Sequence, residues 1–447
     1  MDTLKKWGPL SVVIAVVVLL TGLQSYLRFS AVKNRSSRIV LWHSYIGKEA
    51  DALKEVISRY NSDPSLNGGF QIEVLSVSFN NLPDKLTNSL PRGQGPDIFI
   101  YGHDRLEDWK LKGLLAPLDF WADGNLLNNF FPEKTIDAFI SENRLYGIPL
   151  TAKNLALYYR VLPDGRNPGK EIKMLQDKGQ WNFKNFVKLA KSYTGNCKWK
   201  NDSNCYGLGY LADDAYHHAP WLHSVNGRFV TQDGKINITS HQGIRAAKMA
   251  WDLAGDHKNA VCPPELTYPL MSDLFNRGEI AMVISGPWFM SQLDLNKIKI
   301  GVTSLPEGDS APASPFLTIE GMYLSSKSEN PLAAFRAIRF LTGEFSSEIR
   351  AKKAGQLPVL KTVSQKLKAL CSSDSGCAYN KFHFEEFLKV ARNAIIMPGS
   401  AQARIMWPPY TKALSAIIRR NVSPEKALKE AAWETDKYLG ACLRRGK

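Results

Sequence analysis

Three neighbouring side chains, Tyr101, Asp104 and Arg105, combine an aromatic face, a carboxylate and a guanidinium in one short stretch. They follow the apolar run 98–100, which predicts a short strand buried on both faces. Open α/β sheets bind ligands beyond the carboxyl ends of their strands. A ring can cover the C–H face of a sugar while a charged pair hydrogen-bonds its hydroxyl groups. We therefore interpret the stretch as a candidate carbohydrate site. The structural alternative is a helix-start ion pair beside an ordinary core tyrosine.

A further candidate ring, Trp288, follows a second apolar run at 280–284. The run predicts a buried strand, and Gly286 and Pro287 then turn the chain into a helix, with proline near its first position. Trp288 would thus lie on the first exposed turn at the carboxyl end of a strand. That position favours a platform for a sugar, although a core tryptophan is the alternative.

The elements that must position these side chains alternate between strand and helix. Residues 38–43 read as a strand, 48–60 as a helix, 71–79 as a strand, 82–90 as a helix and 97–101 as a strand. The loop 44–48 follows the first strand and should face the same crevice as Tyr101. Lys48 is therefore a further candidate ligand residue, with a solvated helix-start lysine as the alternative.

Chain length predicts two lobes, because 447 residues exceed what one core of ordinary size can organise. Helices expected at 183–193, 243–255 and 272–277 and strands at 280–284 and 299–305 would build the second lobe. The composition, 44% hydrophobic and 22% charged, is that of a globular protein.

Three segments resemble the maltose/maltodextrin-binding proteins, which are extracytoplasmic solute receptors of ABC sugar importers. They are GPDIFIYGHDR, FNRGEIAMVISGPW and MPGSAQARIMW, and the resemblance spans roughly residues 38–440. It implies a two-lobed α/β fold of the periplasmic-binding-protein type II, in which each lobe is a β-sheet flanked by helices. The expected lobes are 38–151 with 319–364 and 152–318 with 365–447, joined by a hinge that the chain crosses several times.

The resemblance also implies which residues contact the ligand. Tyr101, Asp104, Arg105, Trp288 and Trp407 fall on ligand-contacting positions of that family, with Tyr101 in place of a tryptophan. The implied mechanism is a clamp whose lobes close on an oligosaccharide and whose closed form a membrane permease recognises.

Other positions match less simply. Tyr216 aligns with a stacking tyrosine only across a gap, while Lys153 stands where the family has an acid and Thr411 where it has an arginine. The reversed charge at Lys153 suggests another oligosaccharide, or an acidic or phosphorylated sugar such as a glycerol-phosphate-type ligand.

The function expected from these features is sugar capture for an ABC permease, without enzymatic activity or a cofactor, by a monomer. A membrane-anchored sugar sensor is the alternative with the same fold.

A glycosidase would need paired carboxylates, and Asp104 and Glu320 are the only candidates in the cleft. A metal receptor using His217, His218 and His223 is disfavoured, because adjacent histidines cannot easily face one ion.

The amino terminus carries the one membrane signal. Lys5 and Lys6 precede an apolar run that continues to residue 27, without a clear cleavage site or a cysteine for a lipid. Residues 1–37 are therefore expected to be a signal or anchor segment with its linker, uncleaved in the inner membrane. The flanking Arg28 and Lys33 favour a cytoplasmic domain, but large domains often translocate regardless of charge.

Two closely spaced cysteine pairs, Cys197/Cys205 and Cys371/Cys377, close polar loops of the kind held by disulfides in an oxidising, periplasmic or extracytoplasmic compartment. Neither has the spacing of a zinc site, so no metal is expected. Cys262 and Cys442 either pair or remain thiols.

The net charge of +15 favours contact with an anionic membrane face. Nucleic-acid binding is not expected, because no basic run is interleaved with aromatic residues.

Overall fold

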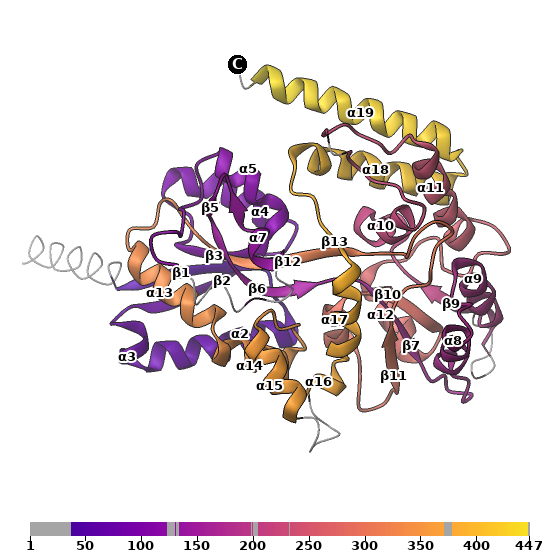
Figure 1. The fold of residues 1–447 in the computed structure, drawn as a ribbon, viewed down its shortest axis with the longest axis horizontal. Helices are drawn as coiled ribbons and strands as arrows, with labels where there is room; N and C mark the ends of the chain where they lie inside the picture. The colour runs from indigo at the N-terminus through magenta and orange to yellow at the C-terminus, as the bar shows by residue number, and fades with distance from the viewer. Residues whose placement is uncertain are drawn as a thin grey trace, which may run out of the picture.

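The computed structural model describes residues 37–122, 130, 134–197, 199, 204–231, 233–370 and 378–445. They form two α/β lobes that lie side by side in Figure 1, each with its own sheet. The two-lobed α/β fold expected from the sequence is thus confirmed. The expected membrane segment at 4–27 lies outside the described residues. Among the residues that the structure describes, no helix is both long enough and apolar enough to cross a bilayer.

The sheet of the first lobe has the strand order β13-β12-β3-β1-β2, with β6 paired to β12 as well. Strands β1, β2 and β3 are parallel, whereas β12 runs antiparallel to β3 and β6. Every residue of β3 is buried, as its continuous apolar run requires. The strands are β1 (Arg38–His43), β2 (Gln71–Ser76), β3 (Ile98–Gly102), β6 (Gly147–Lys153), β12 (Phe316–Leu324) and β13 (Ile395–Ile396).

Helices cover this sheet because each has one apolar stripe. In α2, the buried residues Ala52, Leu53, Val56, Ile57 and Tyr60 recur at the helical spacing. The helices of this lobe are α2 (Gly47–Ser62), α3 (Pro64–Asn67), α4 (Leu82–Ser89), α5 (Leu106–Leu111), α7 (Lys134–Asp137), α13 (Pro331–Thr342), α14 (Glu344–Ala354), α15 (Lys361–Leu370) and α16 (Ala378–Lys381). Two short 3-10 turns, η1 (Leu90–Arg92) and η2 (His103–Arg105), and the hairpin β4 (Ile140–Ser141) with β5 (Arg144–Leu145) complete it.

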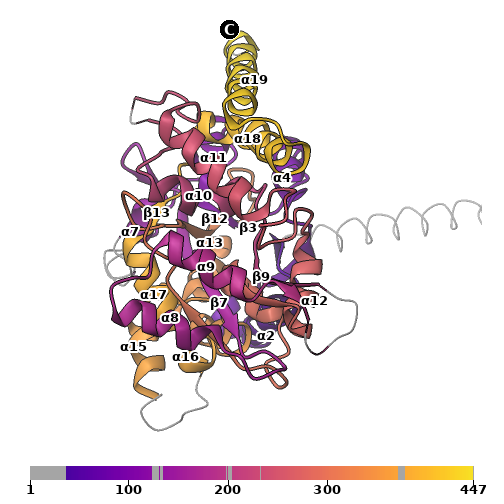
Figure 2. The same ribbon diagram turned by 90° about the vertical axis from the view of Figure 1, so that its right-hand side faces the viewer.

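The second sheet has the order β11-β7-β10-β9-β8, in which only β9 and β10 run parallel. Its strands are β7 (Ala156–Arg160), β8 (Gly195–Asn196), β9 (Asn204–Gly209), β10 (Ile280–Ser285) and β11 (Ile300–Thr303). The surrounding elements are α8 (Pro168–Asp177), α9 (Phe183–Ser192), α10 (Ala215–Ser224), α11 (His241–Ala254), α12 (Tyr268–Arg277), η3 (Pro287–Gln292), α17 (Phe384–Asn393), α18 (Ala401–Arg420) and α19 (Pro424–Arg445). Figure 2 shows α19 extending beyond the rest of the molecule at its C-terminal end.

The chain crosses between the lobes through β6 into β7, back through β12, and again near the carboxyl end. Between α17 and α18 it touches the first sheet once more, where β13 pairs with the start of β12. We place the crossing near the carboxyl end after α16, beyond the boundary expected at residue 364. The reason is that Val363 and Leu367 of α15 are buried and both α15 and α16 pack against α14 of the first lobe. The next helix, α17, packs instead on β7 and β11 of the second lobe.

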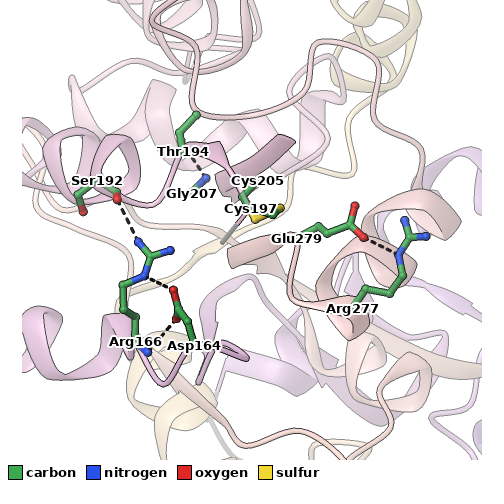
Figure 3. The surroundings of a disulfide bond; sticks show 9 residues. All are labelled: Asp164, Arg166, Ser192, Thr194, Cys197, Cys205, Gly207, Arg277 and Glu279. Carbon is green, nitrogen blue, oxygen red and sulfur yellow. Dashed lines mark hydrogen bonds and ion pairs between the residues drawn. A yellow bond between two sulfur atoms is a disulfide. The ribbon is translucent and has the colours of Figure 1, made fainter. Parts of the chain in front are cut away.

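Cys197 and Cys205 form a disulfide, with 5.1 Å between their Cα atoms. As Figure 3 shows, it lies beside the hydrogen bond that the amide of Gly207 donates to the hydroxyl of Thr194 at 3.0 Å. The disulfide therefore closes the loop of the β8–β9 hairpin. Cys262 is a buried free thiol, and Cys371 and Cys377 lie outside the described residues.

Candidate functional site

A cavity of about 600 Å³ lies between the lobes and is lined by side chains of both. Of the eight ligand-binding residues expected from the sequence, the cavity brings seven together: Tyr101, Asp104, Arg105, Lys153, Tyr216, Trp288 and Trp407. The eighth, Lys48, is exposed on the first turn of α2 and does not line the cavity. The hydrogen bond from Lys297 lowers the pKa of Asp294 on the opposite lobe, and the charge of Lys48 adds a smaller lowering. Thr411, on α18, is not part of the lining either.

Tyr101 does not present an open ring face to the cavity. Its side chain is only 5% exposed, because Phe79 stacks on it with ring centres 5.1 Å apart and ring planes 12° from parallel. Phe79 itself is 53% exposed and lines the cavity. The ring that faces the space between the lobes is therefore Phe79, with Tyr101 and the buried Trp109 behind it.

The second lobe contributes two partly exposed tryptophans. The ring of Trp288, at the start of η3, lies 6.2 Å from that of Tyr216, whose hydroxyl donates to the backbone carbonyl of Lys153 at 3.4 Å. Trp407, on α18, packs edge-on against Phe229 at 5.2 Å and Phe316 at 5.9 Å. Both tryptophans thus pack against neighbouring rings, an arrangement suited to covering sugar faces.

Lys153 is the centre of a buried ionic network at the hinge. Its ammonium group lies 2.8 Å from Oε1 of Glu320 and 3.9 Å from Oε1 of Glu49. The hydroxyl of Tyr45 donates to the other oxygen of Glu320 at 2.9 Å, and Gln356 donates to Glu49 at 3.0 Å. Burial alone would lower the pKa of Lys153, but the charges of Glu320 and Glu49 raise it above its ordinary value. The positive charge of Lys153 is therefore balanced by the carboxylates of Glu320 and Glu49.

The same lysine links the two lobes. Its ammonium group lies 5.6 Å from the ring centre of Tyr45 in the first lobe and 5.7 Å from that of Trp288 in the second. Both distances suit cation–π attraction. A direct ion pair between the lobes joins Arg404 of α18 to Asp108 of α5 at 2.9 Å.

Arg105 retains hydrogen-bonding capacity. Its Nε lies 3.8 Å from Asp104, too far for a hydrogen bond, and has no hydrogen-bond partner among the described residues although it is buried. This N–H is therefore a buried donor that the described residues leave unsatisfied.

The three histidines considered for metal binding all belong to α10 but serve different contacts. His217 pairs with Asp214 at 2.7 Å and His223 with the carbonyl of Ser314 at 2.6 Å. Burial lowers the pKa of His218 to about 3 and that of His223 to about 4, so both are neutral at physiological pH. In the described part of the chain, no three metal-ligating side chains come together.

Four residues of the cavity were not singled out by sequence reasoning, namely Tyr45, Glu49, Phe79 and Arg404. The loop 44–48, which contains Tyr45, was expected to face the crevice, and the same rule could have found Phe79, which follows the carboxyl end of β2. Arg404 lies inside the MPGSAQARIMW segment, where only the tryptophan was considered. Glu49 gave no signal, because an acid in the first turn of a helix is ordinary.

Comparison with known proteins places the chain among solute receptors. Residues 47–344 match the family model described as bacterial extracellular solute-binding protein. The chain is 22% identical over 409 residues to the galactooligosaccharide-binding protein of Bacillus subtilis, covering 89% of each.

Solved structures give the same result. A cyclo/maltodextrin-binding protein complexed with maltotetraose is 25% identical, with a TM-score of 0.70 over 90% of this chain and 97% of that one. The Thermus thermophilus maltotriose binding protein, bound with maltotriose, is 22% identical and shares the fold with a TM-score of 0.73 over 90% of this chain and all of that one. The resemblance inferred from the three sequence segments is thereby confirmed.

Proposed function

The chain belongs to the bacterial extracellular solute-binding proteins, and from that premise we propose that it captures a neutral, maltodextrin-like oligosaccharide for an ABC importer. The observation that carries the proposal is the interlobe cavity, whose lining includes Trp288 and Trp407 of one lobe and Phe79 of the other. Rings from opposite sides suit a flat, hydroxylated chain, whose C–H faces they cover while its edge finds hydrogen bonds.

The charges of the cavity favour a neutral ligand over an acidic or phosphorylated one. Each of its three lysine or arginine side chains in the described residues has an acidic neighbour: Arg105 has Asp104 at 3.8 Å, Lys153 has Glu320 at 2.8 Å, and Arg404 has Asp108 at 2.9 Å. Phosphate recognition generally uses arginine or lysine whose charge is available to the anion. The carboxylates of Asp104, Glu320 and Glu49 would repel an anionic sugar.

Ligand binding would act by shifting the lobes toward closure. An oligosaccharide that touches rings of both lobes gains all its contacts only when they approach, so its differential affinity drives the hinge. The Arg404–Asp108 ion pair would add to the closed state, and a membrane permease would recognise that state. We propose that the receptor works as a monomer outside the cytoplasm, anchored by its amino-terminal segment. The Cys197–Cys205 disulfide is consistent with an oxidising compartment.

A ligand screen tests this function. We expect maltodextrins or other neutral oligosaccharides to raise the melting temperature of the full chain, because a ligand that binds only the folded state stabilises it by mass action. Thermal shift should be measured in a detergent without a sugar head group, against neutral oligosaccharides, uronic acids and sugar phosphates. Stabilisation by anionic sugars alone would contradict the neutral-ligand proposal, and stabilisation by no saccharide would contradict the carbohydrate function.

A variant of Phe79 tests the identity of the stacking ring. Replacing Phe79 by alanine is expected to weaken oligosaccharide binding roughly two- to ten-fold, since an aromatic contact typically contributes about 0.5–1.5 kcal/mol. Phe79→Trp should retain binding. Isothermal titration calorimetry measures both. If Phe79 instead blocked Tyr101 from the sugar, Phe79→Ala would bind more tightly than the natural chain.

A further inference from the structure

The outer face of α19 carries a stripe of three lysines and a tryptophan. Lys426, Lys429, Trp433 and Lys437 recur at spacings of three and four residues, so their side chains lie within about 40° of Trp433 around the helix. All four are exposed, Trp433 by 67%, and Lys437 lies over its ring at 5.2 Å. We define these four residues as the α19 stripe.

The opposite face of α19 is already occupied. Its buried residues Ala427, Leu428, Ala431 and Thr435 face the protein, and the helix packs chiefly against α18. The stripe is therefore free of any intramolecular role in packing. No described acidic side chain lies within ion-pair distance of its three lysines, whereas the nearby Glu434 is held by Lys412 at 3.0 Å.

A hollow of about 720 Å³ adjoins the start of the stripe. It is lined by Lys248 and Trp251 of α11 and by Pro424 and Glu425, which immediately precede the stripe. Three exposed acids of the described part of α19 flank the stripe: Glu430 and Asp436 lie about 60° around the helix from Trp433, and Glu425 about 80°. In Figures 1 and 2, α19 lies at the outer end of the molecule, where a flat surface can approach it.

We propose that the α19 stripe docks the second lobe onto an anionic lipid surface. The stripe is about 16 Å long and straight, which fits a planar array of charges better than a single compact anion. Each lysine near an anionic bilayer contributes on the order of 1 kcal/mol, and tryptophan is at its most stable at the head-group level. The chain's net charge of +15 adds long-range attraction of the same sign. Docking through the stripe does not depend on which solute the cleft holds.

Hydrogen exchange of α19 on vesicles tests the proposal with the full chain. Amides of residues 425–439 are expected to exchange at least about three-fold more slowly on vesicles with roughly one third phosphatidylglycerol than on phosphatidylcholine alone. The difference should vanish in about 1 M KCl, where the screening length falls to about 3 Å.

Matched charge reversals separate the stripe from general basicity. A triple variant should abolish the slowing of exchange on anionic vesicles; it combines Lys426→Glu, Lys429→Glu and Lys437→Glu. Trp433→Ala should reduce the slowing. A control triple variant reverses three exposed lysines elsewhere on the same lobe and should leave the slowing intact; it combines Lys178→Glu, Lys184→Glu and Lys188→Glu. Equal exchange of α19 on both kinds of vesicle would overturn the proposal and leave the stripe as a surface for an acidic protein.

Discussion

Replacing Trp288 and Trp407 together by alanine is expected to weaken oligosaccharide binding by roughly three orders of magnitude. Truncating a well-packed aromatic at a binding site commonly costs about 2 kcal/mol, and both of these rings line the cavity. Both are held by other rings, Trp288 by Tyr216 and Trp407 by Phe229, so little ordering entropy opposes their use. Titration calorimetry of the two single variants and the double variant measures the effect.

The control for that experiment is Trp433→Ala, which removes an exposed tryptophan from α19, far from the cavity lining. It should bind the ligand as the natural chain does. Near-ultraviolet circular dichroism should confirm that the packing of Phe229 and Phe316 survives the loss of Trp407. Unchanged affinity in a well-folded double variant would refute the proposed clamp.

The strands near the site could be predicted closely because their sequences are unambiguous. The run at 98–100 lies in β3 (Ile98–Gly102), where every side chain is buried, and the run at 280–284 lies in β10 (Ile280–Ser285). A continuous apolar segment between glycines has few alternatives to a buried strand. The helix α15 (Lys361–Leu370) is different, because its apolar stripe could pack on either lobe and only tertiary contact decides.

The site could be predicted only in part, because its partners lie far apart in the chain. The resemblance pointed to Lys153 as a reversed charge, and hence to an anionic ligand. The structure pairs it with Glu320, 167 positions away, so the reversed charge is compensated within the protein. Phe79 was not predicted as a site residue because the sequence pattern placed it at the end of a strand. In the structure β2 ends at Ser76, and Phe79 lies in the following loop, where its ring stacks on Tyr101.

Removing the charge of Lys153 should destabilise the fold strongly. In Lys153→Met, the carboxylates of Glu320 and Glu49, only 5% and 9% exposed, lose the cation that compensates them. Breaking a buried ion pair from one side typically costs about 3–5 kcal/mol. The free energy of unfolding, measured by urea denaturation with the ligand absent, should fall by that amount.

Three comparisons make this prediction specific to the buried network. Lys153→Met combined with Glu320→Gln should recover more than half of the loss, because only Glu49 then remains without the cation, and Gln356 still donates to it. Lys366→Met removes the ion pair with Glu348, in which the lysine side chain is 59% exposed. This exposed-pair control should lower the free energy of unfolding by less than about 1 kcal/mol. Protonation neutralises a stranded carboxylate, so the loss in Lys153→Met should be smaller at about pH 4.5 than at about pH 8. A loss that is independent of pH and not recovered in the double variant would mean that Lys153 acts through packing of its hydrocarbon stem between Tyr45 and Trp288.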